Sequence, residues 1–169
     1  MGTGTQTFAR RLAPWLPAIV WAILISWAST DLFSASHTSK YIIPALHWLF
    51  PRASAETLER LHSLIRKSVH LTEYFVFSFL LLRAIRGNHR GWRMHWAIVA
   101  LTIAAGYSAL DEFHQSFVPS RTASPWDSLL DTSGAAIAQV LLWLWFRVRT
   151  RNHVDAPVIV GRTGNQVGR

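Results

Sequence analysis

The chain contains no cysteine, and only 15% of its 169 residues are charged. The absence of cysteine excludes disulfide frameworks, thiolate metal sites and cysteine nucleophiles. An average soluble domain carries about 25% charged residues, so the shortage of charge argues against an ordinary water-exposed surface. The net charge of +8 would also suit a nucleic-acid binder. The positions of the apolar residues argue against that partner.

Half of the residues are apolar, and they form long blocks at 12–28, 69–85, 96–110 and 125–146. A membrane core about 30 Å thick needs roughly 20 helical residues, which three blocks supply once their flanks are included. The third block reaches that length only when its helix continues through residues 111–115. Each helix of a soluble bundle would instead show an apolar stripe opposite a polar face, and the first block is apolar all round. The pattern favours a membrane protein over a soluble bundle.

The sequence therefore predicts an all-α fold, an integral membrane four-helix bundle over residues 12–146. Residues 1–11 are expected to form an N-terminal arm, and residues 147–169 a basic, disordered tail. The first block could instead be a signal peptide, but its apolar stretch exceeds the usual 7–15 residues. We interpret it as a retained span.

An interfacial helical segment is expected between the first two spans. Leu58, Leu61 and Ile65 give residues 55–66 one apolar face, which is typical of a helix lying in the membrane interface. Residues 41–50 before it are interpreted as a loop at the interface. Gly87 is expected to end the second span.

Charge asymmetry predicts the orientation of the spans. Four spans place both termini and the loop at 83–93 on one side, which carries eleven Lys and Arg and one acid. The other side carries six Lys and Arg and eight acids. The positive-inside rule then places both termini in the cytoplasm. Polar residues at the start of spans two and four and at the end of span three consequently meet at the outer face.

Spans two, three and four carry polar side chains that converge on this face. They are Arg66, Lys67, His70, Glu73 and Tyr74 on the second, Asp111, Glu112, His114 and Gln115 on the third, and Asp127 and Asp131 on the fourth. An ionisable side chain at the bilayer centre costs about 2.5–3.5 kcal/mol on insertion scales, and less toward the edge. Small residues at 134 and 138 follow the two acids and would let another helix approach closely. Such a cluster is a candidate functional site.

Structural alternatives exist for single members of the cluster. Ser124, Pro125 and Asp127 form a capping-box pattern at the start of the fourth helix, with Ser124 as the N-cap, Pro125 at N1 and Asp127 at N3. Arg66 or Lys67 could form a simple ion pair with Glu73, which contributes little at a water boundary. A structural polar network is therefore the alternative to a functional cluster.

At these residues the sequence resembles the VanZ-like family. The shared pattern comprises Lys67-x-x-His70-x-x-Glu73-Tyr74, Asp111-Glu112-Phe113-His114-Gln115, Phe117-Val118-Pro119-Ser120-Arg121, and Asp127 with Asp131-x-x-Gly134. It covers residues 15–146. Ser120 and Asp131 depart from it, because glycine and asparagine are frequent there. The resemblance implies a small multi-pass protein of the bacterial plasma membrane, associated with low-level resistance to the glycopeptide teicoplanin.

Our first functional hypothesis is headgroup binding at the outer membrane face. Arg66, Lys67 and Arg121 would hold phosphate or carboxylate groups of a lipid-linked envelope precursor or a glycopeptide. Acids and His114 would contact its sugar or peptide groups. The remaining ligand-binding candidates are His70, Glu73, Tyr74, Asp111, Glu112, Gln115, Asp127 and Asp131.

The alternative is a membrane-embedded hydrolase or transferase, whose catalytic candidates are His70, Glu73, Asp111, His114 and Asp127. The first four are also candidate ligands for zinc or manganese. The H-E-x-x-H zinc motif is absent, so the sequence permits a metal without indicating one. An ion pathway is disfavoured because the polar groups occupy one half of the membrane only.

Overall fold

The computed structural model describes residues 12–30, 34–117 and 124–154, which form five helices and no strand. The helices are α2 (Leu16–Ala28), α3 (Ala35–Leu49), α4 (Ala55–Arg86), α5 (Met94–Gln115) and α6 (Pro125–Val154). The predicted all-α class is confirmed for these residues. Two segments are long and apolar enough to cross a membrane, Ala55–Arg86 and Pro125–Arg149, whereas α2 is apolar but shorter.

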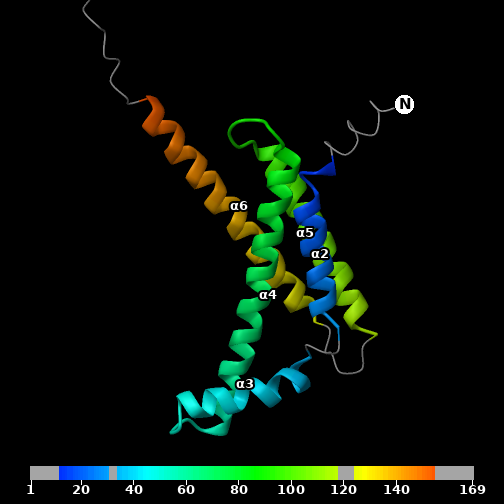
Figure 1. The fold of residues 1–169 in the computed structure, drawn as a ribbon, viewed down its shortest axis with the longest axis vertical. Helices are drawn as coiled ribbons and strands as arrows, with labels where there is room; N and C mark the ends of the chain where they lie inside the picture. The colour runs from blue at the N-terminus through cyan, green and yellow to red at the C-terminus, as the bar shows by residue number, and fades with distance from the viewer. Residues whose placement is uncertain (1–11, 31–33, 118–123, 155–169) are drawn as a thin grey trace, which may run out of the picture.

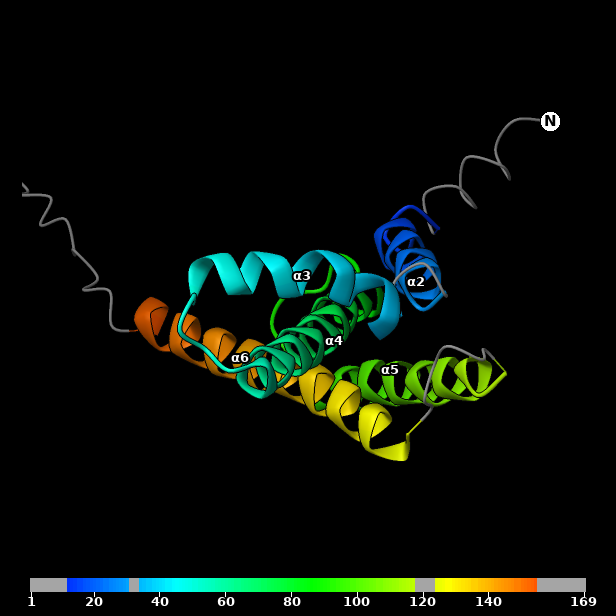
Figure 2. The ribbon, with the colours of Figure 1, turned by 90° about the horizontal axis from the view of Figure 1, so that it is seen from below.

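Helix α4 is the centre of the arrangement, because it contacts each of the other four helices. Figure 1 shows α2, α4, α5 and α6 running in alternating directions, with α3 lying crosswise at the lower end of α4. The view from below in Figure 2 confirms that α3 runs across the long axis. The end of α4, the start of α5 and the end of α6 therefore lie at one end of the molecule, and their opposite ends at the other.

The segment between α2 and the second apolar block differs from the prediction in two respects. Residues 41–50, expected to be a loop, fall largely within α3. Residues 55–66, expected to be a separate interfacial helix, form the first part of α4. No glycine or proline stands between Ala55 and Arg86, so nothing interrupts the helix. The Ser54 hydroxyl caps its start by accepting from the Thr57 N–H at 3.3 Å.

The other helix ends agree more closely with the predictions made from the sequence. Gly87, with φ of +54°, ends α4 as expected. Helix α5 continues through Gln115, which gives it a length of about 33 Å at 1.5 Å per residue. Helix α6 extends past the expected boundary at 146 to Val154. The remaining arm and tail, 1–11 and 155–169, lie outside the described residues.

Close backbone contact holds α6 against α4. A Cβ atom added at Gly134 would collide with the backbone carbonyl of Leu71, at a separation that real Cβ atoms essentially never show. Ala135 and Ala138 on the same side of α6 are fully buried. Tyr74 and Phe77 of α4 are also buried and belong to the same hydrophobic cluster as Ala135. Small residues on one helix therefore make room for large ones on the other.

We predict that Gly134→Ala destabilises the protein by about 1–3 kcal/mol or more, because the clash is with backbone and no side chain can move away. The measurement is thermal unfolding of the purified full-length chain in detergent. Gly106→Ala is the matched control, since a Cβ at Gly106 of α5 would meet nothing within 4 Å. That substitution should be neutral or slightly stabilising, because alanine has the higher helix propensity. Equal unfolding temperatures for the two variants would contradict the close contact.

Candidate functional site

Three carboxylates are buried where α2, α4, α5 and α6 meet. Asp111 is 7% exposed, Glu112 9% and Asp131 1%. A buried carboxylate is costly unless hydrogen-bond donors or a counter-charge satisfy it. The hydrogen-bond donors that contact each carboxylate therefore show which helices the site connects.

Asp111 joins α2 to α5. Its Oδ2 atom accepts a hydrogen bond from the Ser29 hydroxyl at 2.6 Å and another from the Gln115 side-chain amide at 2.7 Å. One turn earlier on α5, the Tyr107 hydroxyl donates to the Ala22 carbonyl at 2.8 Å. Together with the hydrogen bond from the Trp21 indole to the Glu73 carbonyl oxygen at 2.9 Å, these contacts fix the position of the short helix α2.

Asp131 of α6 contacts side chains of both α5 and α4. Its Oδ2 accepts from the Ser108 hydroxyl at 2.9 Å. Its Oδ1 is buried without a hydrogen-bond partner among the described residues, and lies 3.7 Å from His70 Nδ1. The same imidazole nitrogen lies 3.8 Å from Glu73 Oε2. His70 is therefore flanked by two carboxylates, one from its own helix and one from α6.

Tyr74 closes the inner side of this cluster. Its side chain is fully buried, and within the described structure its hydroxyl has no hydrogen-bond partner. The hydroxyl is thus already desolvated in the interior of the bundle.

Glu112 takes the capping role that the sequence assigned to Asp127. The Ser124 backbone N–H donates to Glu112 Oε2 at 2.8 Å, and the Ser124 hydroxyl accepts from the Trp126 N–H at 3.3 Å. A carboxylate from α5 thus anchors the start of α6. Ser124 is the N-cap as predicted, but the reciprocal contact to its N–H comes from Glu112 and not from Asp127, so that part of the capping-box prediction is wrong.

A polar hollow of about 470 Å³ opens between α4, α5 and α6. Its lining includes Arg66, Lys67 and His70 from α4, Glu112 and Gln115 from α5, and Asp127 from α6. We call it the polar hollow. Seven of the twelve predicted ligand-binding residues, those six and Asp131 behind His70, are thus placed at one hollow or directly against its wall.

A second hollow of about 380 Å³ lies on the other side of α4, facing α2 and α3. Most of its wall is apolar, including Trp21, Leu24, Ile65 and Val69. Arg66 and His70 line this apolar hollow as well as the polar one. The two hollows therefore adjoin at the same pair of basic side chains.

Some predicted residues are not brought into the cluster. His114 is exposed on the outer side of α5, because the stripe through Ser108, Asp111 and Gln115 is the one that packs inward. Arg121 lies outside the described residues. Within the part of the chain that the structure describes, no group of three or more His, Asp and Glu side chains is arranged to hold a metal ion. The candidates His70, Glu73, Asp111 and His114 thus do not form a ligand set there.

The sequence reasoning missed the hydroxyl donors. Ser29 and Ser108 bind the two buried aspartates, and Ser128 lies 3.0 Å from the Ser108 hydroxyl. The one available signal was position: Ser108 precedes Asp111 by nearly one turn and so shares its face.

These features define a class: an all-helical protein with apolar helices and a buried acid–histidine cluster beside a basic, polar hollow. The family model described as VanZ/LLP1 matches residues 14–147, most of the chain. The chain belongs to the VanZ-like family, and the resemblance stated above is confirmed. Comparisons with curated proteins and with solved structures gave no match.

The Ser29–Asp111 contact gives a test of this network. Ser29→Ala should cost about 1 kcal/mol, and Asp111→Ala about 2–4 kcal/mol, because the latter strands two buried donors. The double variant should lose less than the sum, with a coupling energy of about 1 kcal/mol. Unfolding in detergent measures all three. Strict additivity would show that the two side chains do not interact.

Proposed function

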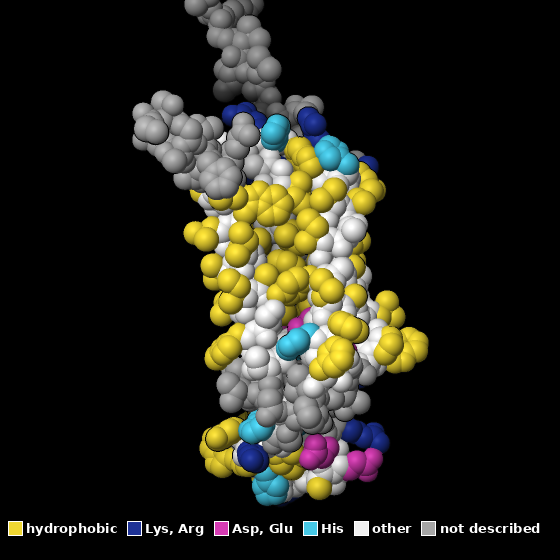
Figure 3. All heavy atoms as spheres, turned by 90° about the vertical axis from the view of Figure 1, so that its right-hand side faces the viewer, with side chains coloured by type: hydrophobic (Ala, Val, Ile, Leu, Met, Phe, Trp, Pro, Cys, Tyr) yellow, Lys and Arg dark blue, Asp and Glu magenta, His cyan; other side chains and the backbone are white. Residues whose placement is uncertain are grey.

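We propose that this protein spans the membrane with four helices, α2, α4, α5 and α6, and binds the polar headgroup of an amphiphile in the polar hollow. Figure 3 shows a broad band of hydrophobic side chains between charged ends. Many large apolar side chains on these helices are exposed, among them Leu24, Phe79, Ile98 and Leu141. Soluble monomers rarely expose contiguous apolar patches of more than a few hundred Å².

Helix lengths support the same assignment. Arg66 and Arg86 on α4 are separated by about 30 Å at 1.5 Å per residue, the thickness of a bilayer core. Asp127 and Arg147 on α6 have the same separation. Polar residues thus mark both membrane faces on two neighbouring helices. His70, Glu73 and Asp131 then lie one or two turns inside the membrane, below the mouth of the polar hollow.

The observation that carries the proposal is the adjacency of the two hollows. Arg66 and Lys67 offer cations for a phosphate or carboxylate, and Asp127 offers an acceptor for hydroxyl or amide groups. Next to them, the apolar hollow offers a wall for a hydrocarbon chain. Pockets of this mixed kind bind molecules with a polar head and an apolar tail.

Charge asymmetry supports an outer-face position for the polar hollow in a bacterial plasma membrane, with both termini cytoplasmic. Lipid-linked envelope precursors and acylated glycopeptides present sugars, peptide or phosphate on an apolar chain at that face. Binding either one is the function we propose. It offers a physical basis for the glycopeptide-resistance role that the family resemblance suggested.

The test is binding of a polyprenyl-diphosphate-linked sugar to the full-length protein in detergent, measured by native mass spectrometry against phosphatidylcholine. Arg66→Gln combined with Lys67→Gln should weaken binding about tenfold or more, because charge-assisted contacts are lost. Arg52→Gln with Arg60→Gln is the matched control. Both control residues are exposed at the same end and outside the hollow.

The control should bind within about twofold of the parent, since exposed charges contribute little. Equal losses in both double variants would indicate a non-specific charge effect. Retention of the sugar-linked probe no stronger than phosphatidylcholine would overturn headgroup binding.

His70 favours a second candidate function, acid–base catalysis in a hydrolase or transferase. A histidine whose Nδ1 faces a buried carboxylate presents Nε2 as a general base, as in catalytic triads. Asp131→Asn should then retain binding of the probe but lower its turnover by about 100-fold or more. Mass spectrometry of the reaction mixture measures turnover. Unchanged probe after incubation with the parent protein would exclude this candidate.

A further inference from the structure

A third hollow lies at the opposite end of the molecule from the polar hollow. Figure 1 shows α6 diverging from α4 toward its C-terminal end. A hollow of about 860 Å³ opens there between the α4–α5 connection and α6. We call it the basic hollow.

The lining of the basic hollow carries one sign of charge. Arg86 and Arg90 come from the end of α4 and the connection, and Arg147 and Arg149 from α6. No Asp or Glu is among the described residues that line it. Four guanidinium groups around one space repel one another unless an anion lies between them.

Aromatic rings orient three of these arginines. Arg86 lies over the Phe146 ring at 5.2 Å, Arg147 over Trp143 at 5.0 Å and Arg149 over Trp145 at 5.2 Å. Stacking uses the flat face of a guanidinium and leaves its edge N–H groups available to bind an oxyanion. The rings therefore reduce the conformational freedom of the three arginines by contacting the flat faces of their guanidinium groups.

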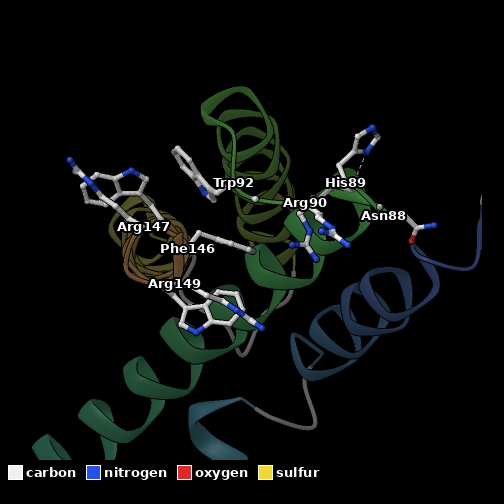
Figure 4. Close-up of a pocket in the computed structure, with 12 residues that line it drawn as sticks. Asn88, His89, Arg90, Trp92, Phe146, Arg147 and Arg149 are labelled. Atoms are coloured by element: carbon white, nitrogen blue, oxygen red, sulfur yellow. Dashed lines mark hydrogen bonds between the residues drawn. The ribbon is translucent and has the colours of Figure 1, made fainter. Parts of the chain in front are cut away.

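Trp92 supplies a second, independent sign of an absent acceptor. Its ring lies between α6 and α5 in Figure 4, on the wall of the basic hollow. The indole N–H is buried and has no hydrogen-bond partner within the described residues. A buried donor of this kind normally has a partner. His89, by contrast, points away from α6, and its ring nitrogen lies 2.9 Å from the Arg86 carbonyl oxygen.

We propose that the basic hollow binds the phosphate of an anionic membrane lipid from the leaflet at this end. Arg86 and Arg147 lie about 30 Å of helix from the opposite polar face, at the depth of lipid headgroups. Leu144, Trp145 and Val148 are exposed on α6 beside the hollow and offer contact to acyl chains. A soluble phosphate would use the arginines but not this apolar surface.

This site is separate from the headgroup site of the polar hollow, and it would select among lipids by the negative charge of the headgroup and not by sugar or peptide groups. The inference rests on the proposed four-span arrangement, in which the positive-inside rule would place this site at the cytoplasmic leaflet, whose anionic lipids attract basic clusters. Lipid phosphate between α6 and the α4–α5 connection would bridge two segments that diverge from each other.

The experiment is native mass spectrometry of the full-length protein with phosphatidylglycerol, with phosphatidylcholine of the same acyl chains, and with glycerol phosphate. Phosphatidylglycerol should bind about tenfold tighter than phosphatidylcholine. Arg90→Gln combined with Arg149→Gln, one from each wall, should remove about that factor. Trp92→Phe keeps the ring but removes the N–H, and should weaken phosphatidylglycerol binding severalfold.

Arg83→Gln with Arg93→Gln is the matched control, because both are exposed at the same end and neither lines the hollow. This control should bind phosphatidylglycerol like the parent, and unfolding temperatures without added lipid should show that every variant is folded. Equal loss in both double variants would overturn the site in favour of general charge attraction. Binding of glycerol phosphate as tight as that of phosphatidylglycerol would overturn the lipid assignment in favour of a soluble phosphate.

Discussion

The contact of Gly134 with the Leu71 carbonyl determines most of what is distinctive in this structure. It brings the backbones of α4 and α6 together at one level of the bundle. Asp131 lies one turn before Gly134 on the same stripe of α6, and His70 precedes Leu71 on α4, so the contact sets the acid beside the imidazole. Beyond the contact the two helices diverge, and the basic hollow occupies the space between them. A larger residue at 134 would therefore disturb both the Asp131–His70 contact and the basic hollow.

The way in which the buried acids are satisfied decides the charge of the polar hollow. Hydroxyl and amide donors bind Asp111 and Asp131, and His70 faces the second of them. In the described part of the chain, neither aspartate forms an ion pair with a Lys or Arg side chain. Arg66 and Lys67 therefore contribute their charge to the hollow instead of neutralising the core. Neutral hydroxyl and amide donors thus bind the buried aspartates, and Arg66 and Lys67 remain at the mouth of the polar hollow.

The sequence predicted the helices and the convergence of polar residues because both follow from periodicity. Apolar blocks and one-turn spacings specify which face of a helix points inward, and Asp131, His70 and Glu73 meet as that geometry requires. The hydrogen-bond partners of individual side chains could not be predicted, because they depend on how each helix is rotated about its axis and on how the helices cross. Asp127 has the spacing of a cap, yet Glu112 reaches the same N–H from another helix. Likewise, the apolar face of residues 55–66 is compatible with a separate interfacial helix and with the first part of one long helix. The sequence therefore could not decide between the two, and the structure has the long helix.

The two ends of the bundle differ in what they can recognise. The polar hollow combines cations with carboxylates, so an anion alone would meet repulsion as well as attraction there. A headgroup that carries hydroxyl or amide donors beside its phosphate satisfies both signs, which favours a sugar- or peptide-bearing ligand. Arginines line the basic hollow without acids among its described residues, so a simple phosphodiester meets attraction only. Because about 30 Å of helix separates the two, one headgroup cannot occupy both. The selectivity proposed for the first end and the charge attraction proposed for the second therefore follow from one difference: acids line the polar hollow and are absent from the described lining of the basic hollow.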